Sequence, residues 1–88
     1  MGKVYVRGTF NPCRLAILRT LARRPGFSWA TVKEIAVGAG CASGSVYQAV
    51  GLLCGAGLIS ALFDDYPVRY RITAEGLRAL AEGVTDAD

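Results

Sequence analysis

The sequence of 88 residues predicts a single α+β domain that is mainly α-helical. Three observations predict this class. Apolar residues recur at helical spacing in segments between residues 12 and 56, and helix-capping residues flank those segments. A strictly alternating segment, 68–72, then indicates a β-strand, and a further helical segment follows it. Because 52% of the residues are hydrophobic, most of the chain is expected to fold.

The first predicted helix begins at Asn11-Pro12 and runs to about Arg23. An asparagine side chain can cap the free amides of a first turn, and proline fits there without losing a hydrogen bond. The segment Arg24-Pro25-Gly26 ends the helix, because proline restricts the residue before it and glycine permits a turn. The aliphatic residues of this helix fall along one side and beside it, at Leu15, Leu18, Ala22, Ile17 and Leu21.

Two short helices are predicted next, and together they form a helix-turn-helix. Thr31 and Glu34 have the spacing of a capping box, so the second helix begins there, and Gly38 and Gly40 end it. Ser43 is expected to cap the third helix. Gly57 fits the left-handed position after that helix, where Leu58 would contact Leu53. The facing apolar stripes are Val32, Ile35, Ala36 and Ala39, then Val46, Ala49, Val50 and Leu53.

A two-stranded hairpin and a short last helix complete the fold. Residues 58–63 form a plausible buried strand, and Asp64–Pro67 form a turn. In 68–72, apolar residues alternate with Arg69 and Arg71, which places the two arginines on the opposite face. Thr73 caps a helix that runs to about Ala81. Three helices, a hairpin and a short helix are the order of a winged helix-turn-helix.

The domain is expected to span residues 11–83. Residues 1–10 form an N-terminal arm or a short strand, since Val4 and Val6 alternate with their neighbours. Residues 84–88 form an acidic, disordered tail. The uncharged stretch 35–63 is long enough for a membrane span, and Gly51 and Gly55 have the spacing of helix-dimer contacts. Helix caps within and around that stretch favour a globular fold without a membrane.

Composition argues against catalysis and metal binding. Histidine is absent, so the commonest general base and zinc ligand are both missing. The cysteines, Cys13, Cys41 and Cys54, form no C-x-x-C motif, which favours a reducing, cytoplasmic compartment. We therefore expect no enzyme, no metal and no cofactor. The basic residues outnumber the acidic ones, 10 to 7, and the first third of the chain is basic, which suggests an anionic partner.

Two segments resemble winged helix-turn-helix transcriptional regulators of the PadR-like and MarR-like families. Residues 42–59, ASGSVYQAVGLLCGAGLI, resemble the PadR pattern of a small cap, Val-Tyr, spaced aliphatics and Gly-Leu-Ile. Residues 69–80, RYRITAEGLRAL, resemble its Tyr-Arg-Leu-Thr-x-x-Gly ending. The resemblance implies a regulator that binds double-stranded DNA. The chain departs from it in having no cation on the recognition helix and no long helices after Asp88, so ligand sensing by such an extension is not expected.

The recognition helix is predicted to span about 43–56 and to enter the major groove. Gln48 could bond adenine, and Ser45 and Tyr47 suit phosphate oxygens. Tyr47 could instead pack against the fold, and the whole face could be an ordinary polar surface. The wing strand, 68–72, would contact the DNA backbone or the minor groove. The predicted DNA-binding residues are Ser43, Gly44, Ser45, Tyr47, Gln48, Lys33, Arg69 and Arg71, with Lys3 and Arg7 of the arm as further contacts.

The prediction is a small sequence-specific DNA-binding protein, a transcriptional repressor in preference to an activator. A homodimer is expected, because a domain of this size leaves part of its apolar surface exposed. Two alternatives stay open: a protein-docking module that uses the uncharged face around Gly51, Leu52 and Gly55, and an architectural or replication accessory factor. Cys41, in the turn before the recognition helix, is also a candidate redox residue, although a small buried cysteine is the commoner role.

Overall fold

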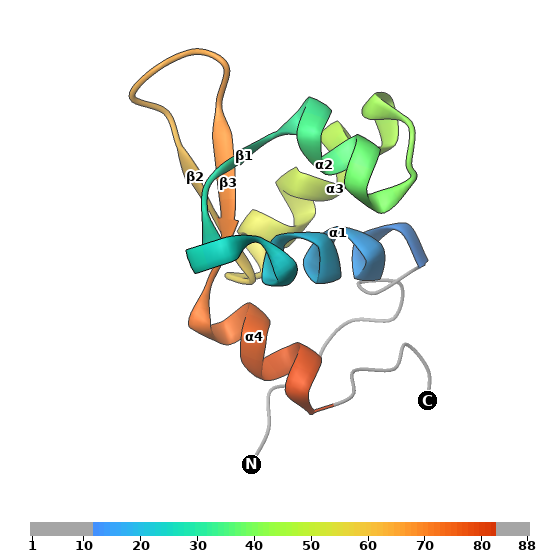
Figure 1. The fold of residues 1–88 in the computed structure, drawn as a ribbon, viewed down its shortest axis with the longest axis vertical. Coiled ribbons are helices and arrows are strands. Elements are labelled where there is room, and N and C mark those ends of the chain that lie inside the picture. Colours follow the sequence, from blue (N-terminus) through green and yellow to red (C-terminus); the bar gives the residue numbers. More distant parts are fainter. Residues whose placement is uncertain (1–11, 83–88) are drawn as a thin grey trace.

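The structure is a computed structural model that describes residues 12–82. The predicted arm with Lys3 and Arg7, the cap Asn11 and the acidic tail lie outside this range. Figure 1 shows helices α1 to α3 packed beside a small sheet, with α4 below them. In chain order the elements are α1 (Pro12–Arg23), a 3₁₀ helix η1 (Pro25–Phe27), β1 (Ala30–Thr31), α2 (Val32–Ala39), α3 (Ser43–Gly55), β2 (Ile59–Leu62), β3 (Arg69–Ile72) and α4 (Ala74–Ala81).

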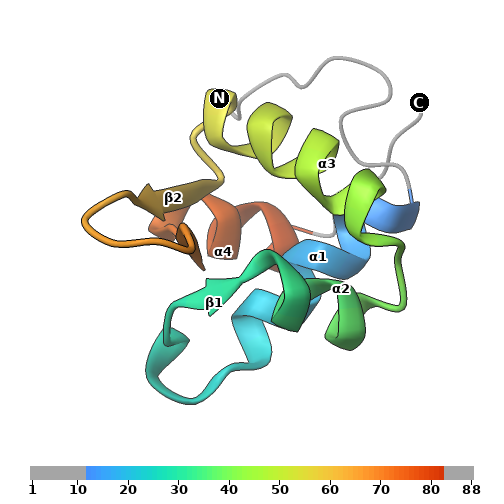
Figure 2. The same cartoon turned by 90° about the horizontal axis from the view of Figure 1, so that it is seen from above.

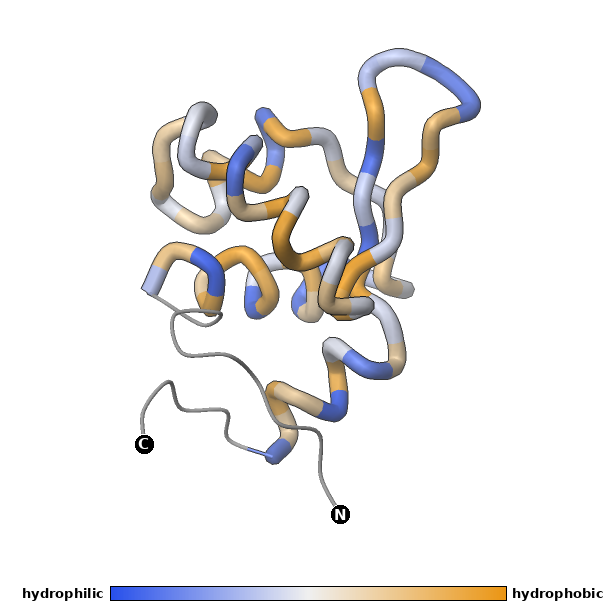
Figure 3. The backbone as a smooth tube through the Cα atoms, turned by 180° about the vertical axis from the view of Figure 1, so that it is seen from behind, coloured by the Kyte–Doolittle hydropathy of each residue, from blue (hydrophilic) through white to orange (hydrophobic). Residues whose placement is uncertain are grey.

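The core lies where α1, α2 and α3 meet the inner face of the sheet. Ile17, Leu18 and Leu21 of α1 are fully buried, whereas Leu15 and Ala22 are only partly buried. The buried side of α1 is therefore centred on Ile17, Leu18 and Leu21. The sequence placed Ile17 and Leu21 beside the main apolar row of this helix and not within it. The predicted stripe of α3 is buried at every position. Figure 3 shows apolar residues concentrated along α1 and α3 and hydrophilic ones at the tip of the β2–β3 loop.

The capping box at the start of α2 is confirmed. The Glu34 amide donates to the Thr31 hydroxyl at 3.2 Å, and the Thr31 amide donates to Glu34 Oε1 at 2.9 Å. At the other end of α2, Gly40 has a φ of 70°, a left-handed conformation that favours glycine.

The prediction that Ser43 caps α3 is wrong. Ala42 occupies the cap position with extended backbone and no side-chain hydrogen bond, and Ser43 is already the first helical residue. The Ala42 carbonyl accepts the first intrahelical bond, from the Val46 amide at 3.1 Å. A hydroxyl must come one residue before the helical backbone to reach the free amides of the first turn. Ser43 therefore faces solvent and does not cap the helix.

A single junction connects the end of α3 to the start of α4. Gly57 has a φ of 79°, its amide bonds the Cys54 carbonyl, and the Leu58 amide bonds the Leu53 carbonyl, each at 3.0 Å. These two bonds form the predicted Schellman motif. The Thr73 hydroxyl then donates to the Gly57 carbonyl at 2.7 Å and accepts from the Gly76 amide at 3.1 Å, so it also caps α4 as predicted.

The sheet has three antiparallel strands in the order β1-β3-β2. The sequence predicted only the β2–β3 hairpin, which we call the wing. Strand β1 pairs Ala30 with Tyr70 and Thr31 with Arg69. Two residues are too few to show a strand period, so only the partner strand could reveal β1. Figure 2 shows the wing extending to one side of the helices.

Candidate nucleic-acid interface

Helix α3 presents an uncharged polar face. Its buried side consists of Val46, Ala49, Val50 and Leu53, which fixes the opposite side outward. The residues predicted for this outward side are all exposed: Ser43, Gly44, Ser45, Tyr47, Gln48 and Gly51. Tyr47 is 61% exposed, so it is not packed into the fold, which was the alternative that the sequence left open. The placement of these residues agrees with the sequence, and their binding role stays a prediction.

The exposed face of α3 divides into a central strip and two flanks. Gly44, Gln48 and Gly51 lie opposite the buried residues and form the central strip. Ser45 lies on the flank toward α1, and Tyr47 lies on the flank toward the wing, because each lines a different hollow on the surface. The sequence suggested one continuous polar face on α3, whereas the fold divides these residues among a central strip and two flanks.

The first hollow, which we call the wing groove, lies between α2, α3 and the wing. Its volume is about 400 Å³. Lys33 and Tyr47 line it from the helices, and Tyr66 and Pro67 line it from the loop of the wing; its other lining residues are Thr31, Val32, Val68 and Tyr70. Lys33 is exposed, so its ammonium group can reach a molecule that lies across this groove. The structure thus places Lys33 in the same groove as Tyr47 of α3, and its binding role stays a prediction.

The second hollow, which we call the α1–α3 crevice, lies on the other flank of α3. Its volume is about 150 Å³, and it is lined by Cys13, Arg14, Ser45, Gln48 and Ala49. Figure 2 shows the N-terminal turns of α1 beside the first turns of α3. Arg14 was absent from the predicted site residues. No local motif connects Arg14 to Ser45 or Gln48, so only the packing of α1 against α3 reveals the cluster.

Both arginines of the wing strand have charged or aromatic neighbours within the protein. The Arg71 guanidinium lies over the Trp29 ring, 5.3 Å from its centroid, in a cation–π contact. Arg69 pairs with Thr31 across the sheet, and its positive charge contributes to lowering the pKa of Glu34. Both arginines are partly buried. The alternation in the sequence predicts an outward face for both arginines but gives no sign of Trp29, which comes just before strand β1.

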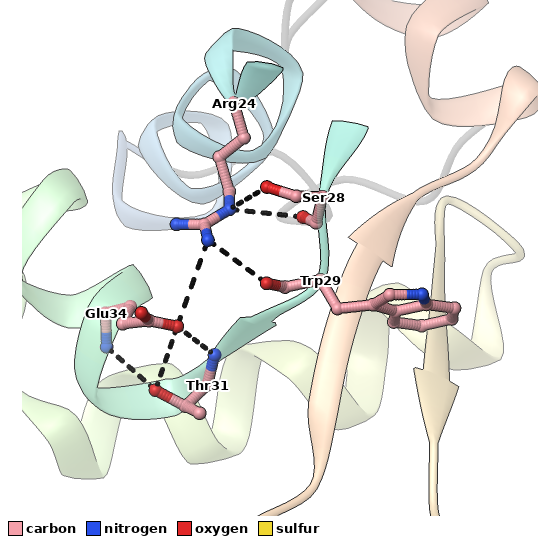
Figure 4. Close-up of polar contacts among 5 residues, drawn as sticks. All are labelled: Arg24, Ser28, Trp29, Thr31 and Glu34. Carbon is pink, nitrogen blue, oxygen red and sulfur yellow. Dashed lines mark hydrogen bonds and ion pairs between the residues drawn. The ribbon is translucent and has the colours of Figure 1, made fainter. Parts of the chain in front are cut away.

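A second arginine network fixes the approach to α2 (Figure 4). Arg24 Nε donates to the carbonyl and the hydroxyl of Ser28, each at 3.1 Å, and Arg24 Nη2 donates to the Trp29 carbonyl at 3.1 Å. The same Nη2 lies 4.0 Å from Glu34 Oε1. The pKa of Glu34 is lowered, chiefly by the hydrogen bond from the Thr31 amide, with Arg24 contributing. This network holds β1 and the start of α2, and with them Lys33, in place.

The three cysteines are free thiols, and each is partly buried. Cys41 lies between α2 and α3 with its Sγ 3.7 Å from the Ala39 carbonyl oxygen. Burial and the neighbouring Cys41 raise the pKa of Cys13 to about 11, so the Cys13 thiol is protonated at neutral pH. Burial also raises the pKa of Cys54. A redox role for Cys41 stays a prediction.

Membrane and metal features can be examined over residues 12–82. In this range no single helix is long and apolar enough to cross a membrane. Helices α2 and α3 together reach that length and apolarity, but they are bent by 106° at the break between them. Within the same described residues, no group of three or more His, Cys, Asp or Glu side chains could hold a metal ion.

The arrangement of α1, α2 and α3, followed by the wing and α4, with β1 completing the sheet, is a winged-helix fold. A solved structure with this fold, a MarR family protein from Bacillus stearothermophilus, is similar to this chain with a TM-score of 0.70 and 23% sequence identity. The similarity covers 83% of this chain and 50% of that protein, so this chain spans about half its length.

The comparisons confirm the predicted winged helix-turn-helix fold. The MarR family protein supports the MarR-like resemblance at the level of the fold, and the PadR-like resemblance stays a prediction. No family model matches the sequence, and no curated protein is significantly similar to it.

Proposed function

We propose that this protein binds double-stranded DNA with a preference for sequence and acts as a transcriptional regulator. The observation that supports this function best is the exposed face of α3, with Gln48 in its central strip and a hollow on either flank. A helix with a polar, solvent-exposed face in a helix-turn-helix is suited to the major groove. The similar MarR family protein supports the fold on which this proposal depends.

The positions around α3 suggest separate roles. Gln48 can make a bidentate hydrogen bond to adenine. Gly44 and Gly51, beside it in the central strip, carry no side chains that would keep the base edges away. Tyr47 and Lys33, which line the wing groove, are suited to phosphate oxygens of one strand. Arg69 and Arg71 are proposed as backbone contacts of the wing, and Arg71 also makes the cation–π contact with Trp29.

We further propose a cytoplasmic homodimer that represses by occupying its site. Two copies would present two α3 helices about one DNA turn apart, which is the usual spacing of helix-turn-helix half-sites.

Asp64 and Asp65 at the tip of the wing are exposed, and their charge would keep the tip itself away from phosphates.

The first test is fluorescence anisotropy with a mixed-sequence duplex at about 50 and 200 mM salt. Micromolar binding that weakens steeply with salt is expected, because each phosphate contact releases counterions. The replacement Lys33→Gln should weaken binding, whereas Arg78→Gln, on α4 and paired with Glu75, should leave it unchanged. Absence of binding at the lower salt by the folded protein would contradict the proposal.

Protein docking is a second candidate function, and one observation favours it. Helix α3 has no charged side chain, and its apolar residue Leu52 is 40% exposed. If docking is the function, Leu52→Asp abolishes a protein interaction and Lys33→Gln has no effect. If DNA binding is the function, the uncharged replacement Leu52→Asn leaves DNA binding nearly unchanged, since Leu52 lies beside the central strip and not within it.

A further inference from the structure

We infer that the α1–α3 crevice is a binding site for a backbone phosphate of DNA, in which Arg14 supplies the cation that α3 itself lacks. This inference rests on the proposed function and adds Arg14, which no local motif connects to α3, to the residues that contact DNA. Its site lies on the flank of α3 opposite the wing groove and involves neither the wing nor Lys33.

The charge distribution is the first argument. No charged residue occurs between Ile35 and Phe63, so the whole of α3 is uncharged. Helix α1 is basic, and it places Arg14 in the same crevice as Ser45 and Gln48. A basic residue of one helix thus lines the same crevice as the polar flank of another. A recognition helix without its own cation can in this way still have a positive charge at its edge.

The donors that line the crevice suit an anion. Arg14 offers N–H groups in a planar fork and Ser45 offers a hydroxyl, while none of the lining residues is acidic. The pKa of Cys13 is raised to about 11, so its thiol is neutral and does not repel an anion. Because a guanidinium carries several donors, Arg14 can keep a protein partner and still bond a phosphate.

The size and position of the crevice fit a phosphate group better than a larger small molecule. Its volume of about 150 Å³ is below the ~300–1,000 Å³ of typical small-molecule pockets, and a phosphate group needs only a few atoms of space. Ser45 lies three residues before Gln48, so the two are neighbours along α3. A phosphate held by Arg14 and Ser45 would therefore fix α3 at a set depth while Gln48 faces the base edges.

The test compares two arginines of the same helix. Arg14→Gln should weaken binding to every duplex about tenfold or more, since a charge-assisted hydrogen bond to a phosphate is lost. It should also reduce the slope of log K against log salt by about 0.9. Arg14→Lys should restore the slope but only part of the affinity, because it keeps the charge and loses the fork. The control, Arg19→Gln, alters an exposed arginine outside both hollows and should change neither quantity.

The outcomes separate this inference from the proposed function. If the unaltered protein does not bind DNA, the proposed function is wrong and the inference is wrong with it. If the unaltered protein binds and Arg14→Gln retains both affinity and salt slope, the inference alone is overturned. Should Arg14→Gln not fold, Ser45→Asp tests the same crevice at an exposed position, and unchanged binding in that variant would overturn the inference.

Discussion

At the scale of single residues, Gly76 lies where the fold leaves no room for a Cβ atom. A Cβ atom at this position would lie against the Leu58 carbonyl oxygen and 2.6 Å from Cγ1 of Ile72. The backbone of Leu58 cannot give way easily, because it belongs to the junction between α3 and α4. We expect Gly76→Ala to lower the free energy of unfolding by about 1–3 kcal/mol in urea denaturation.

Gly55 supplies the control for that measurement. It also lies in a helix, but a Cβ there would meet nothing within 4 Å. Gly55→Ala should therefore leave the free energy of unfolding unchanged or raise it by up to about 1 kcal/mol. Equal destabilisation by the two alanines would show that close packing is not the reason for Gly76.

Replacing Gln48 should reduce the preference for one DNA sequence, whereas replacing Lys33 should reduce the affinity for every DNA sequence. After selection of a preferred DNA sequence, Gln48→Ala should reduce the preference for it by about 1–3 kcal/mol, as loss of one bidentate contact predicts. Lys33→Gln should weaken all sequences alike and reduce the salt slope by about 0.9. Competition binding with selected and scrambled duplexes measures both effects. A uniform loss in Gln48→Ala would argue against base reading by Gln48.

At the scale of elements, the start of α2 depends on the capping box. Thr31→Ala removes the oxygen that accepts from the Glu34 amide, and this should cost about 1 kcal/mol of unfolding free energy. Thr31→Ser keeps a hydroxyl at the same place and should cost less. Thermal unfolding of the two variants makes the comparison. If both cost the same, the methyl group of Thr31 and not its hydroxyl is the stabilising part.

The lowered pKa of Glu34 predicts a pH dependence with a definite sign. Because the folded state favours the ionised carboxylate, this contribution to stability is fully present above the ordinary pKa of a glutamate. It is lost as the pH falls through the lowered pKa of the folded state. Glu34→Gln should therefore reduce stability at neutral pH, and the difference from the unaltered protein should shrink as the pH falls below the ordinary pKa range of a glutamate. A difference that stays constant would contradict this role of the charge.

The helices could be predicted from the sequence because each carries several independent signals. The buried stripe of α3, the capping box at Thr31 and the left-handed Gly57 agree with one another and with the structure. Ser43 shows the limit of such signals, since a capping residue type one position too late becomes part of the helix. Strand β1 exists only through its pairing with β3, which no local pattern could indicate.

The candidate site could be predicted only in part, because some of its residues come together only when the chain folds. Exposure of Gln48 and Tyr47 follows from the helical period, and the structure agrees. The contact of Arg71 with Trp29, and the crevice that Arg14 and Ser45 both line, each involve segments distant in sequence. Such contacts result from tertiary packing, which the spacing of residues along the chain does not encode.

At the scale of the whole molecule, exposed apolar side chains favour self-association. Phe63 is 74% exposed at the wing, and Leu77 and Leu80 on α4 are only partly buried. We expect sedimentation equilibrium to give twice the mass of the single chain, with dissociation on dilution. A single-chain mass at every concentration would contradict the homodimer, and the two half-sites proposed for DNA would then have to be bound by separate molecules.

The lack of charge on α3 has a consequence for how such a protein could change. In the proposed mode of binding, the positive charges lie on α1, α2 and the wing, whereas the side chain that reads bases lies on α3. The strength of attraction and the choice of sequence then depend on different elements. Exchanging Gln48 and its neighbours in the central strip would redirect the protein to another site on DNA while leaving its salt dependence as it was, so targets could diverge without any loss of affinity for DNA as a polymer.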